Sequence, residues 1–126
     1  MFDRIVLRGT EGGLKGQEFA LENETKYILG RSRECSLPLP DPYLQISRYH
    51  CRIKVSAPSV VIQDLGSLNG TYVNGEKIGQ RRKEQSFEEA LQEEHEKFPL
   101  GDGDQLRIGD HVFQVEFNPS ASCAVA

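Results

Sequence analysis

The feature of this sequence that most constrains its fold is a series of short runs in which apolar and polar residues alternate. In the last run, "HVFQVEF", Phe113, Val115 and Phe117 share one face of an extended chain. Such alternation predicts half-buried β-strands. The predicted strands cover residues 4–8, 17–21, 27–29, 50–55, 59–64, 71–73, 104–108 and 111–117. Many short strands separated by turn residues are typical of an antiparallel sandwich or barrel.

Size and charge narrow the class of protein. The 126 residues suit one domain, and the net charge of −4 argues against nucleic acid as the main partner. The three cysteines are odd in number and lack C-x-x-C spacing, which argues against a disulfide framework or a zinc site and favours a reducing compartment. The sequence carries neither a signal-peptide pattern nor an apolar stretch of membrane-spanning length. We therefore expect an intracellular, cytoplasmic protein that does not bind membranes.

The histidines give no sign of catalysis. His50, His95 and His111 do not stand at metal-ligand spacing, and the sequence contains no P-loop and no nucleophile elbow. No nucleophile or base has an evident orienting partner. The sequence therefore predicts a protein that is not an enzyme, with no catalytic residues, no metal site and no cofactor.

One segment departs from the strand pattern and predicts a helix over residues 86–97. Ser86 followed by Glu89 forms a capping box, which marks a helix start. A narrow apolar stripe follows, made of Phe87, Ala90 and Leu91. The surrounding insertion, residues 80–98, holds four basic residues and six glutamates. Two interpretations stay open: a solvated helix docked by one or two side chains, or a helix that binds a partner.

Three loops carry side chains that suit an anion. Gly30-Arg31-Ser32 follows a predicted strand, Ser47-Arg48 precedes another, and Ser67–Gly70 follows a third. Alternate loops of a sandwich gather at one end, so the three loops are expected to meet. An arginine fork matches a phosphate bidentately, and hydroxyl and amide groups add further donors. The combination predicts a small phosphate-binding pocket.

Two Asn-Gly pairs mark corners, because both residue types tolerate positive φ. Asn74-Gly75 stands between "TYV" and "EKI" and predicts a tight hairpin turn. Asn69-Gly70 follows a connection too long for a two-residue turn. The amide of Asn69 can bond a ligand's backbone through both its carbonyl and its NH₂ group. Asn69-Gly70 is therefore interpreted as a corner that also clamps a ligand.

The order and spacing of these motifs resemble those of the forkhead-associated (FHA) domain family. The family pattern of Gly-Arg, Ser-x-x-His and Asn-Gly is matched by Gly30-Arg31, by "SRYH" starting at Ser47, and by Asn69-Gly70. The closing stretch "LGDGDQLRIGDHVFQVEF" is similar as well. The resemblance implies an all-β fold, an antiparallel β-sandwich of about eleven short strands with one inserted helix. It implies a domain over residues 1–118, followed by a tail or linker start over 119–126.

The resemblance also implies a function, the binding of phosphothreonine in partner proteins. The implied phosphate-binding residues are Arg31, Ser47, Arg48 and Ser32. Asn69 and Gly70 would hold the peptide backbone, Gln45 and Leu68 would form a specificity loop, and Gly30 and His50 would be scaffold. The implied partner is a threonine-phosphorylated protein or peptide, for example a Ser/Thr kinase or its substrate. The alternative is a scaffold of the same fold that joins proteins and ignores phosphate.

Two departures from the family pattern carry expectations of their own. Leu68 stands where many members have a small hydroxyl residue, and the neighbouring Ser67 is a candidate to replace it. The insertion at 80–98 is longer than the usual connection. Because it follows the hairpin that comes after the Asn69 corner, we expect it to emerge on the side away from the binding loops.

Overall fold

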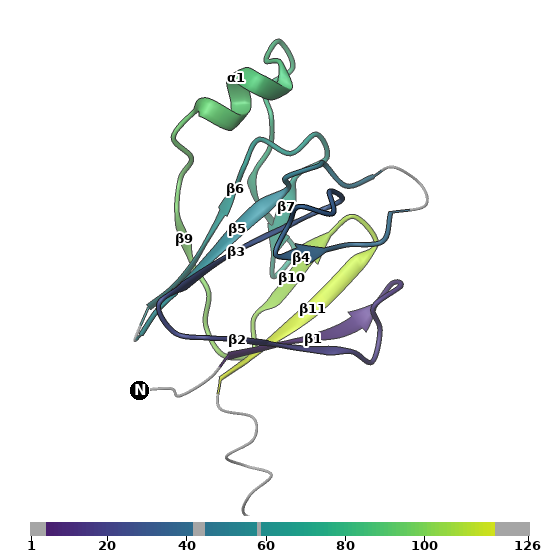
Figure 1. Ribbon diagram of the computed structural model, residues 1–126, viewed down its shortest axis with the longest axis vertical. Coiled ribbons are helices and arrows are strands. Elements are labelled where there is room, and N and C mark those ends of the chain that lie inside the picture. Colours follow the sequence, from purple (N-terminus) through teal and green to yellow (C-terminus); the bar gives the residue numbers. More distant parts are fainter. Residues whose placement is uncertain (1–4, 42–44, 58, 118–126) are drawn as a thin grey trace, which may run out of the picture.

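The structure, a computed structural model, describes residues 5–41, 45–57 and 59–117. Within these residues the chain forms two β-sheets and one short helix (Figure 1). The elements are β1 (Ile5–Glu11), β2 (Glu18–Leu21), β3 (Thr25–Gly30), β4 (Leu37–Pro38), β5 (Cys51–Ser56), β6 (Ser59–Asp64), β7 (Thr71–Val73), β8 (Glu76–Gly79), α1 (Phe87–Gln92), β9 (Phe98–Pro99), β10 (Gln105–Ile108) and β11 (His111–Phe117). The first sheet has the order β2-β1-β11-β10-β7-β8 and the second has the order β4-β3-β5-β6-β9.

The two sheets enclose one apolar core, as the alternating runs predict. In β5 the side chains of Cys51, Ile53 and Val55 are fully buried, whereas the intervening Lys54 is exposed. The first sheet contributes residues such as Phe113 of β11, which is also fully buried. Burial of an aliphatic or aromatic side chain of this size stabilises a fold by about 1.5–3 kcal/mol. The all-β sandwich with eleven strands in the described residues is thus confirmed.

Two strands escape detection in the sequence because they are too short to show alternation. β4 pairs in parallel with β3 through Leu29 and Leu37, and β9 pairs antiparallel with β6 through Ile62 and Phe98. Each strand contains a proline and lies at the edge of its sheet. A proline lacks the N–H that a central strand must donate, so an edge is where such a strand is tolerated.

The predicted C-terminal boundary of the domain is not tested by the structure. The boundary at residue 118 and the tail at 119–126 lie outside the described residues. Among the residues that are described, no helix is long and apolar enough to cross a membrane.

The predicted capping box is present, but the helix is shorter than its sequence suggests. The Oγ atom of Ser86 accepts a hydrogen bond from the Glu89 N–H at 3.1 Å, and the Ser86 N–H donates to Glu89 Oε1 at 2.9 Å. The helix ends at Gln92 instead of residue 97. The chain is drawn away because the carbonyl of His95 accepts a hydrogen bond at 2.8 Å from the side chain of Gln63 in β6. The segment then enters β9 beside β6.

The apolar stripe of the helix is only partly buried. Ala90 is fully buried and Phe87 is half-buried, but Leu91 is exposed. The helix is therefore docked by two side chains of the stripe, Ala90 and Phe87, and Leu91 takes no part. The early end of the helix leaves one turn and a half, so only the side that carries Ala90 reaches the sandwich.

The insertion at 80–98 does not emerge away from the binding loops, and that prediction is wrong. β7 leaves the Asn69 corner, but β8 runs back antiparallel beside it, with Gly79 opposite Thr71. Two antiparallel strands return a chain to the end where it started. The insertion therefore begins next to Asn69, and α1 lies at the same end of the sandwich, at the top of Figure 1.

The turn between β7 and β8 has the predicted form. Asn74 and Gly75 both have positive φ, 53° and 82°. The side chain of Asn74 also accepts a hydrogen bond from the Gln105 N–H at 2.9 Å and donates to Asp104 at 3.1 Å. This turn therefore closes the hairpin and fastens it to the start of β10.

Candidate functional site

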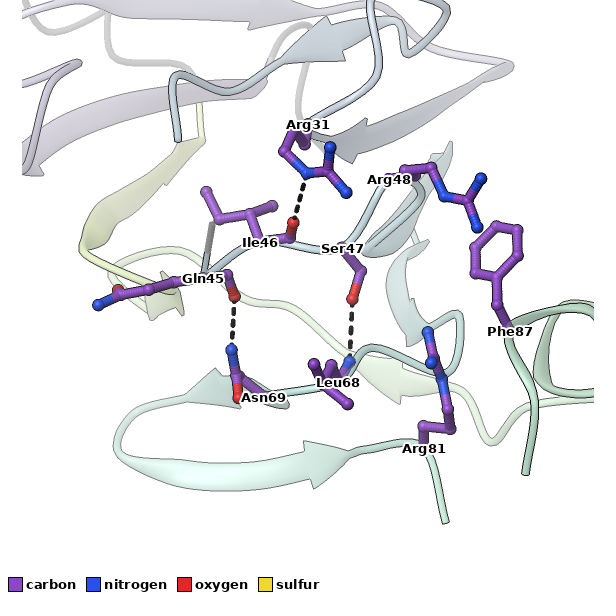
Figure 2. A pocket seen from close by; sticks show the side chains of 9 residues that line it. All are labelled: Arg31, Gln45, Ile46, Ser47, Arg48, Leu68, Asn69, Arg81 and Phe87. Atoms are coloured by element: carbon purple, nitrogen blue, oxygen red, sulfur yellow. Dashed lines mark hydrogen bonds between the residues drawn. The ribbon is translucent and has the colours of Figure 1, made fainter. Parts of the chain in front are cut away.

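A pocket of about 200 Å³ lies at the end of the sandwich where the predicted loops meet (Figure 2). Its lining consists of Arg31, Gln45, Ile46, Ser47, Arg48, Leu68, Asn69, Arg81 and Phe87. These residues come from four segments that are far apart in the sequence: the loop after β3, the loop before β5, the corner before β7, and the insertion. The expectation that three loops gather is confirmed, and the insertion joins them.

Contacts of its Nε atom orient Arg31, so that its guanidinium faces the pocket. Its Nε atom donates a hydrogen bond to the carbonyl of Ile46 at 3.1 Å and lies 3.7 Å from a carboxylate oxygen of Asp41. The Asp41 side chain is only 4% exposed, and it also accepts the N–H groups of Gln45 and Ile46 at 2.7 and 2.8 Å. Sequence analysis did not identify Asp41. Its role is to fix Arg31 and the Ser47 loop relative to each other.

Ser47 places a hydroxyl beside this guanidinium. Its Oγ atom accepts a hydrogen bond from the Leu68 N–H at 2.9 Å, which leaves the hydroxyl proton for an acceptor in the pocket. Its carbonyl accepts the Arg31 N–H at 3.0 Å. Ser47 therefore links the arginine loop to the corner before β7 and still has one donor to offer a ligand.

His50 is a fully buried brace between two of the loops. Its Nδ1 atom accepts a hydrogen bond from the Ser47 N–H at 3.2 Å, and its Nε2 atom lies 2.8 Å from the carbonyl of Gly70. A backbone N–H can only donate, so Nδ1 carries no proton and Nε2 donates. The structure therefore requires the neutral imidazole, protonated at Nε2.

The free energy of unfolding should depend on pH through His50. Burial lowers the pKa of His50 below the ordinary value of 6.5, which it regains in the unfolded chain. Its contribution to stability is therefore complete above pH 6.5 and is lost as the pH falls from 6.5 toward the lowered folded pKa. Urea unfolding of the wild type should lose about 1 kcal/mol per pH unit in this range from His50 alone.

A His50→Gln variant is the matched control for that measurement, because its amide keeps one acceptor and one donor without titrating near pH 6. The difference between the wild type and this variant should shrink as the pH falls below 6.5. Parallel stability curves for the two proteins between pH 7.5 and 5 would contradict the neutral, buried histidine.

Asn69 does not adopt the positive φ that its sequence predicts. Among the described residues, the non-glycine positions with positive φ are Glu24 and Asn74, and of the Asn69-Gly70 pair only Gly70 has one, 93°. The backbone conformation at position 69 therefore does not require asparagine. Its exposed side chain donates from Nδ2 to the carbonyl of Gln45 at 2.8 Å. That bond orients the amide at the rim of the pocket and leaves its carbonyl oxygen for a ligand.

A buried carboxylate shapes the corner that carries Asn69. Asp64 accepts the N–H groups of Gly66 and Ser67 at 2.9 and 3.0 Å, and the hydroxyls of Ser67 and Thr71 at 2.5 and 2.7 Å. The Ser67 hydroxyl in turn accepts the Gly70 N–H at 2.9 Å. Because Ser67 is fully buried in this network, it does not replace the missing hydroxyl at Leu68. That prediction is wrong.

Two predicted contact residues are not among the residues that line the pocket. Ser32 accepts the Glu34 N–H at its own hydroxyl, 3.1 Å, and donates its N–H to the carbonyl of Arg48 at 3.2 Å. Gly70 uses its carbonyl for His50 and its N–H for Ser67. Among the described residues, neither Ser32 nor Gly70 lines the pocket. Both support the loops that do.

The insertion supplies two lining residues that sequence analysis missed, Arg81 and Phe87. The guanidinium carbon of Arg48 lies 3.9 Å from the centre of the Phe87 ring, and that of Arg81 lies 5.7 Å from it. Tyr49 stacks on the same ring at 6.2 Å. The sequence held a signal for Arg81. The second strand of a hairpin returns to the end where the first began, so a residue two positions after that strand lies beside the corner that starts the hairpin.

The insertion is attached to the Asn69 corner at close range. A Cβ atom at Gly66 would lie 2.4 Å from the Cβ of Ala90 in α1. Arg81 donates its backbone N–H to Ser67 at 2.7 Å and its Nε to Gly66 at 3.0 Å. Gln80 donates to the carbonyl of Leu68 at 2.6 Å. This part of the insertion is thus built onto the same loop that presents Asn69.

Replacing Gly66 with alanine should destabilise the protein and displace α1. Gly66 has φ 82° and no room beside Ala90, so the variant suffers both backbone strain and a clash. Gly75 has the same φ of 82° with nothing within 4 Å, which makes Gly75→Ala a control for strain alone. We expect Gly75→Ala to cost about 1 kcal/mol and Gly66→Ala about 2–3 kcal/mol, measured by urea unfolding. Equal costs would contradict the close packing of α1 on this loop.

The sequence profile of the FHA domain family matches residues 27–109, a range that includes the whole lining of the pocket. The chain belongs to the FHA domain family. The match runs from within β3 to the turn after β10, so the insertion and α1 lie inside this FHA domain and not beside it.

Sequence relatives of this FHA domain include proteins of different sizes. It is 36% identical to FhaB of Mycobacterium tuberculosis over 69 residues, which are 55% of this chain and 43% of FhaB. It is 27% identical to the human protein named angiogenic factor with G patch and FHA domains 1 over 108 residues, which are 84% of this chain and 14% of that protein. The matched part thus spans less than half of either relative.

Solved structures share the fold over nearly the whole FHA domain. A structure from a study of phosphothreonine-dependent FHA domain interactions has a TM-score of 0.69 and 26% identity, and the match covers 92% of this chain and 98% of that chain. Mycobacterium tuberculosis EmbR in complex with a low-affinity phosphopeptide has a TM-score of 0.67 and 26% identity, covering 90% of this chain and 24% of EmbR.

Proposed function

We propose that this FHA domain binds phosphothreonine in partner proteins and so joins proteins in response to phosphorylation. One observation carries the proposal. The Arg31 guanidinium, which is oriented by its hydrogen bond to Ile46, and the Ser47 hydroxyl line the same pocket. Arg31 and Ser47 bind the phosphate, and Arg48 adds positive charge at its edge. Asn69 binds the peptide backbone next to the phosphothreonine.

The chemistry of these groups suits a phosphate more than a carboxylate. A phosphothreonine side chain carries a charge of about −1.5 to −2 at pH 7 and three acceptor oxygens. Arg31 offers its two terminal nitrogens, because its Nε is already bonded to the carbonyl of Ile46. Ser47 offers one proton to a third oxygen. The set of donors therefore matches the three oxygens in number and kind.

The amide at the rim suits an extended peptide. Asn69 is already oriented by the carbonyl of Gln45, so it can accept a peptide N–H without first losing rotational freedom. Gln45 is neutral and Leu68 is 58% exposed. Both stand where they can contact the residues that flank a phosphothreonine, and we assign them to ligand selection.

The similar proteins support this proposal. One similar structure comes from work on phosphothreonine-dependent FHA domain interactions, and EmbR is in complex with a phosphopeptide. FHA domains are binding modules, and we propose that this one has no catalytic activity of its own. Candidate partners are a threonine-phosphorylated protein such as a Ser/Thr kinase or its substrate. A reducing cytoplasm as its location suits the buried free thiols of Cys35 and Cys51.

The test is a titration of the purified protein with three fluorescent peptide pools. Each pool has a fixed central residue, phosphothreonine, phosphoserine or threonine, and degenerate flanks without charged residues. We expect saturable binding of the phosphothreonine pool, weaker binding of the phosphoserine pool, and none of the threonine pool. Equal binding of the phosphothreonine and threonine pools would overturn the proposal and indicate a scaffold that ignores phosphate.

A further inference from the structure

Two arginines share one aromatic ring at the insertion side of the pocket. Arg48 lies 3.9 Å and Arg81 lies 5.7 Å from the centre of the Phe87 ring. Both distances are within the range of a cation–π contact. Two positively charged groups from segments more than thirty residues apart in the sequence thus lie close to one ring.

Within the described part of the chain, neither of these arginines has a carboxylate partner. Among the described residues no acidic side chain lies within salt-bridge distance of Arg48 or Arg81. The next residue, Arg82, behaves differently, because its guanidinium donates to Glu93 at 2.8 Å. The two positive charges repel each other, and their attraction to the ring offsets only part of this repulsion. An anion bound between the two guanidinium groups would neutralise the rest.

Arg81 is also prepared for such an anion. Its backbone N–H and its Nε atom are bonded to the carbonyls of Ser67 and Gly66. These two bonds fix the start of the side chain and one edge of the guanidinium. The terminal nitrogens are thereby left for a ligand, as they are in Arg31, and little conformational freedom remains to be lost on binding.

Arg48 and Arg81 lie on the side of Ser47 opposite Gln45 and Asn69. In Figure 2, Gln45 and Asn69 stand at one end of the pocket, Arg48, Arg81 and Phe87 stand at the other, and Ser47 lies between them. A peptide whose phosphothreonine occupies the middle and whose backbone is held by Asn69 on one side can continue over Arg48 and Arg81 on the other side. The residue that arrives there belongs to the other flank of the phosphothreonine.

We propose that Arg48 and Arg81, held on Phe87, form a second anion subsite for an acidic group on that flank of the phosphopeptide. The inference rests on the proposed function, since it takes the phosphothreonine position as its reference. A second phosphate should bind there more tightly than a carboxylate, because it has the higher charge and one more oxygen. The favoured ligands are therefore doubly phosphorylated peptides.

The experiment compares single peptides by fluorescence anisotropy. The reference peptide has one phosphothreonine in an alanine and glycine background, and a matched peptide has unmodified threonine. Two further sets add a phosphoserine or an aspartate at each of the three positions on either side. For the wild type we expect the second phosphate to improve affinity about tenfold on one flank only, and the aspartate to improve it less at the same positions.

Variants then assign the gain to Arg81. The measured quantity is the ratio of the affinities for the doubly and singly phosphorylated peptides. In Arg81→Gln the ratio should fall to about one, whereas Arg82→Gln, the matched loss of charge one residue away, should keep the wild-type ratio. Melting curves establish that both variants are folded.

The outcomes separate this inference from the proposed function. If the reference peptide binds no better than its unmodified match, the proposed function fails. If it binds better but no second acidic group at any position improves affinity, the subsite alone is overturned. A ratio that falls as far in Arg82→Gln as in Arg81→Gln would also overturn it, because the gain would then be a general effect of charge.

Discussion

Replacing Arg31 with alanine should weaken binding of a single-phosphothreonine peptide at least about 30-fold. Truncating one partner of a hydrogen-bonded charge pair typically costs about 2–5 kcal/mol, and we take the lower end because the Arg31 side chain is 42% exposed. A loss of 2 kcal/mol is about 30-fold in the dissociation constant. Isothermal titration with the tightest peptide from the phosphothreonine pool measures it directly.

Two other variants make the result specific. Arg33→Ala removes the same charge from an exposed position in the same loop and should leave affinity within about twofold. Arg31→Lys keeps the charge but loses the planar fork, and should fall between the wild type and the alanine variant. Wild-type affinity in a folded Arg31→Ala protein would contradict the role of Arg31 in phosphate binding.

Replacing Asp64 with alanine should lower the free energy of unfolding by at least about 3 kcal/mol. Asp64 is buried, and its two carboxylate oxygens accept from two backbone N–H groups and two hydroxyls. A buried donor left without an acceptor costs about 1–3 kcal/mol. The hydroxyls of Ser67 and Thr71 can rotate toward other acceptors, but the N–H groups of Gly66 and Ser67 cannot. Urea unfolding measures the loss.

Asp64→Asn is the matched variant, because it keeps the volume and one acceptor oxygen. The oxygen can serve the two N–H groups, and the rotated hydroxyls can accept from the amide NH₂. We therefore expect it to cost about 1 kcal/mol, clearly less than alanine. An alanine variant within 0.5 kcal/mol of the wild type would show that the Asn69 corner does not depend on this carboxylate.

These two residues illustrate different degrees of predictability. Arg31 stands out in the sequence because Gly-Arg recurs in order with Ser-x-x-His and Asn-Gly. Asp64 does not, because an aspartate at the end of a strand is common and its four donors come from residues whose positions only the folded corner defines. Motif order therefore identifies residues that face a ligand more readily than residues that support them.

Local patterns in the sequence determined most of the architecture. Alternation marked the longer strands, Asn74-Gly75 marked the hairpin, and Ser86 with Glu89 marked the helix start. Each of these signals acts between residues a few positions apart, where sequence spacing and spatial distance are nearly the same thing. The two-residue strands β4 and β9 lack such a signal, since they exist only through pairing with a longer neighbour.

The tertiary structure alone decided where the insertion lies and what it contributes. The contact between Gly66 and Ala90 and the hydrogen bond between Gln63 and His95 join residues distant in sequence. Such contacts depend on the directions of whole strands, which no window of the sequence encodes. For that reason the sequence could place Arg31, Ser47 and Asn69 in one pocket, and its Asn74-Gly75 hairpin implied a position for Arg81 beside them, but no local pattern brought Phe87 into the pocket.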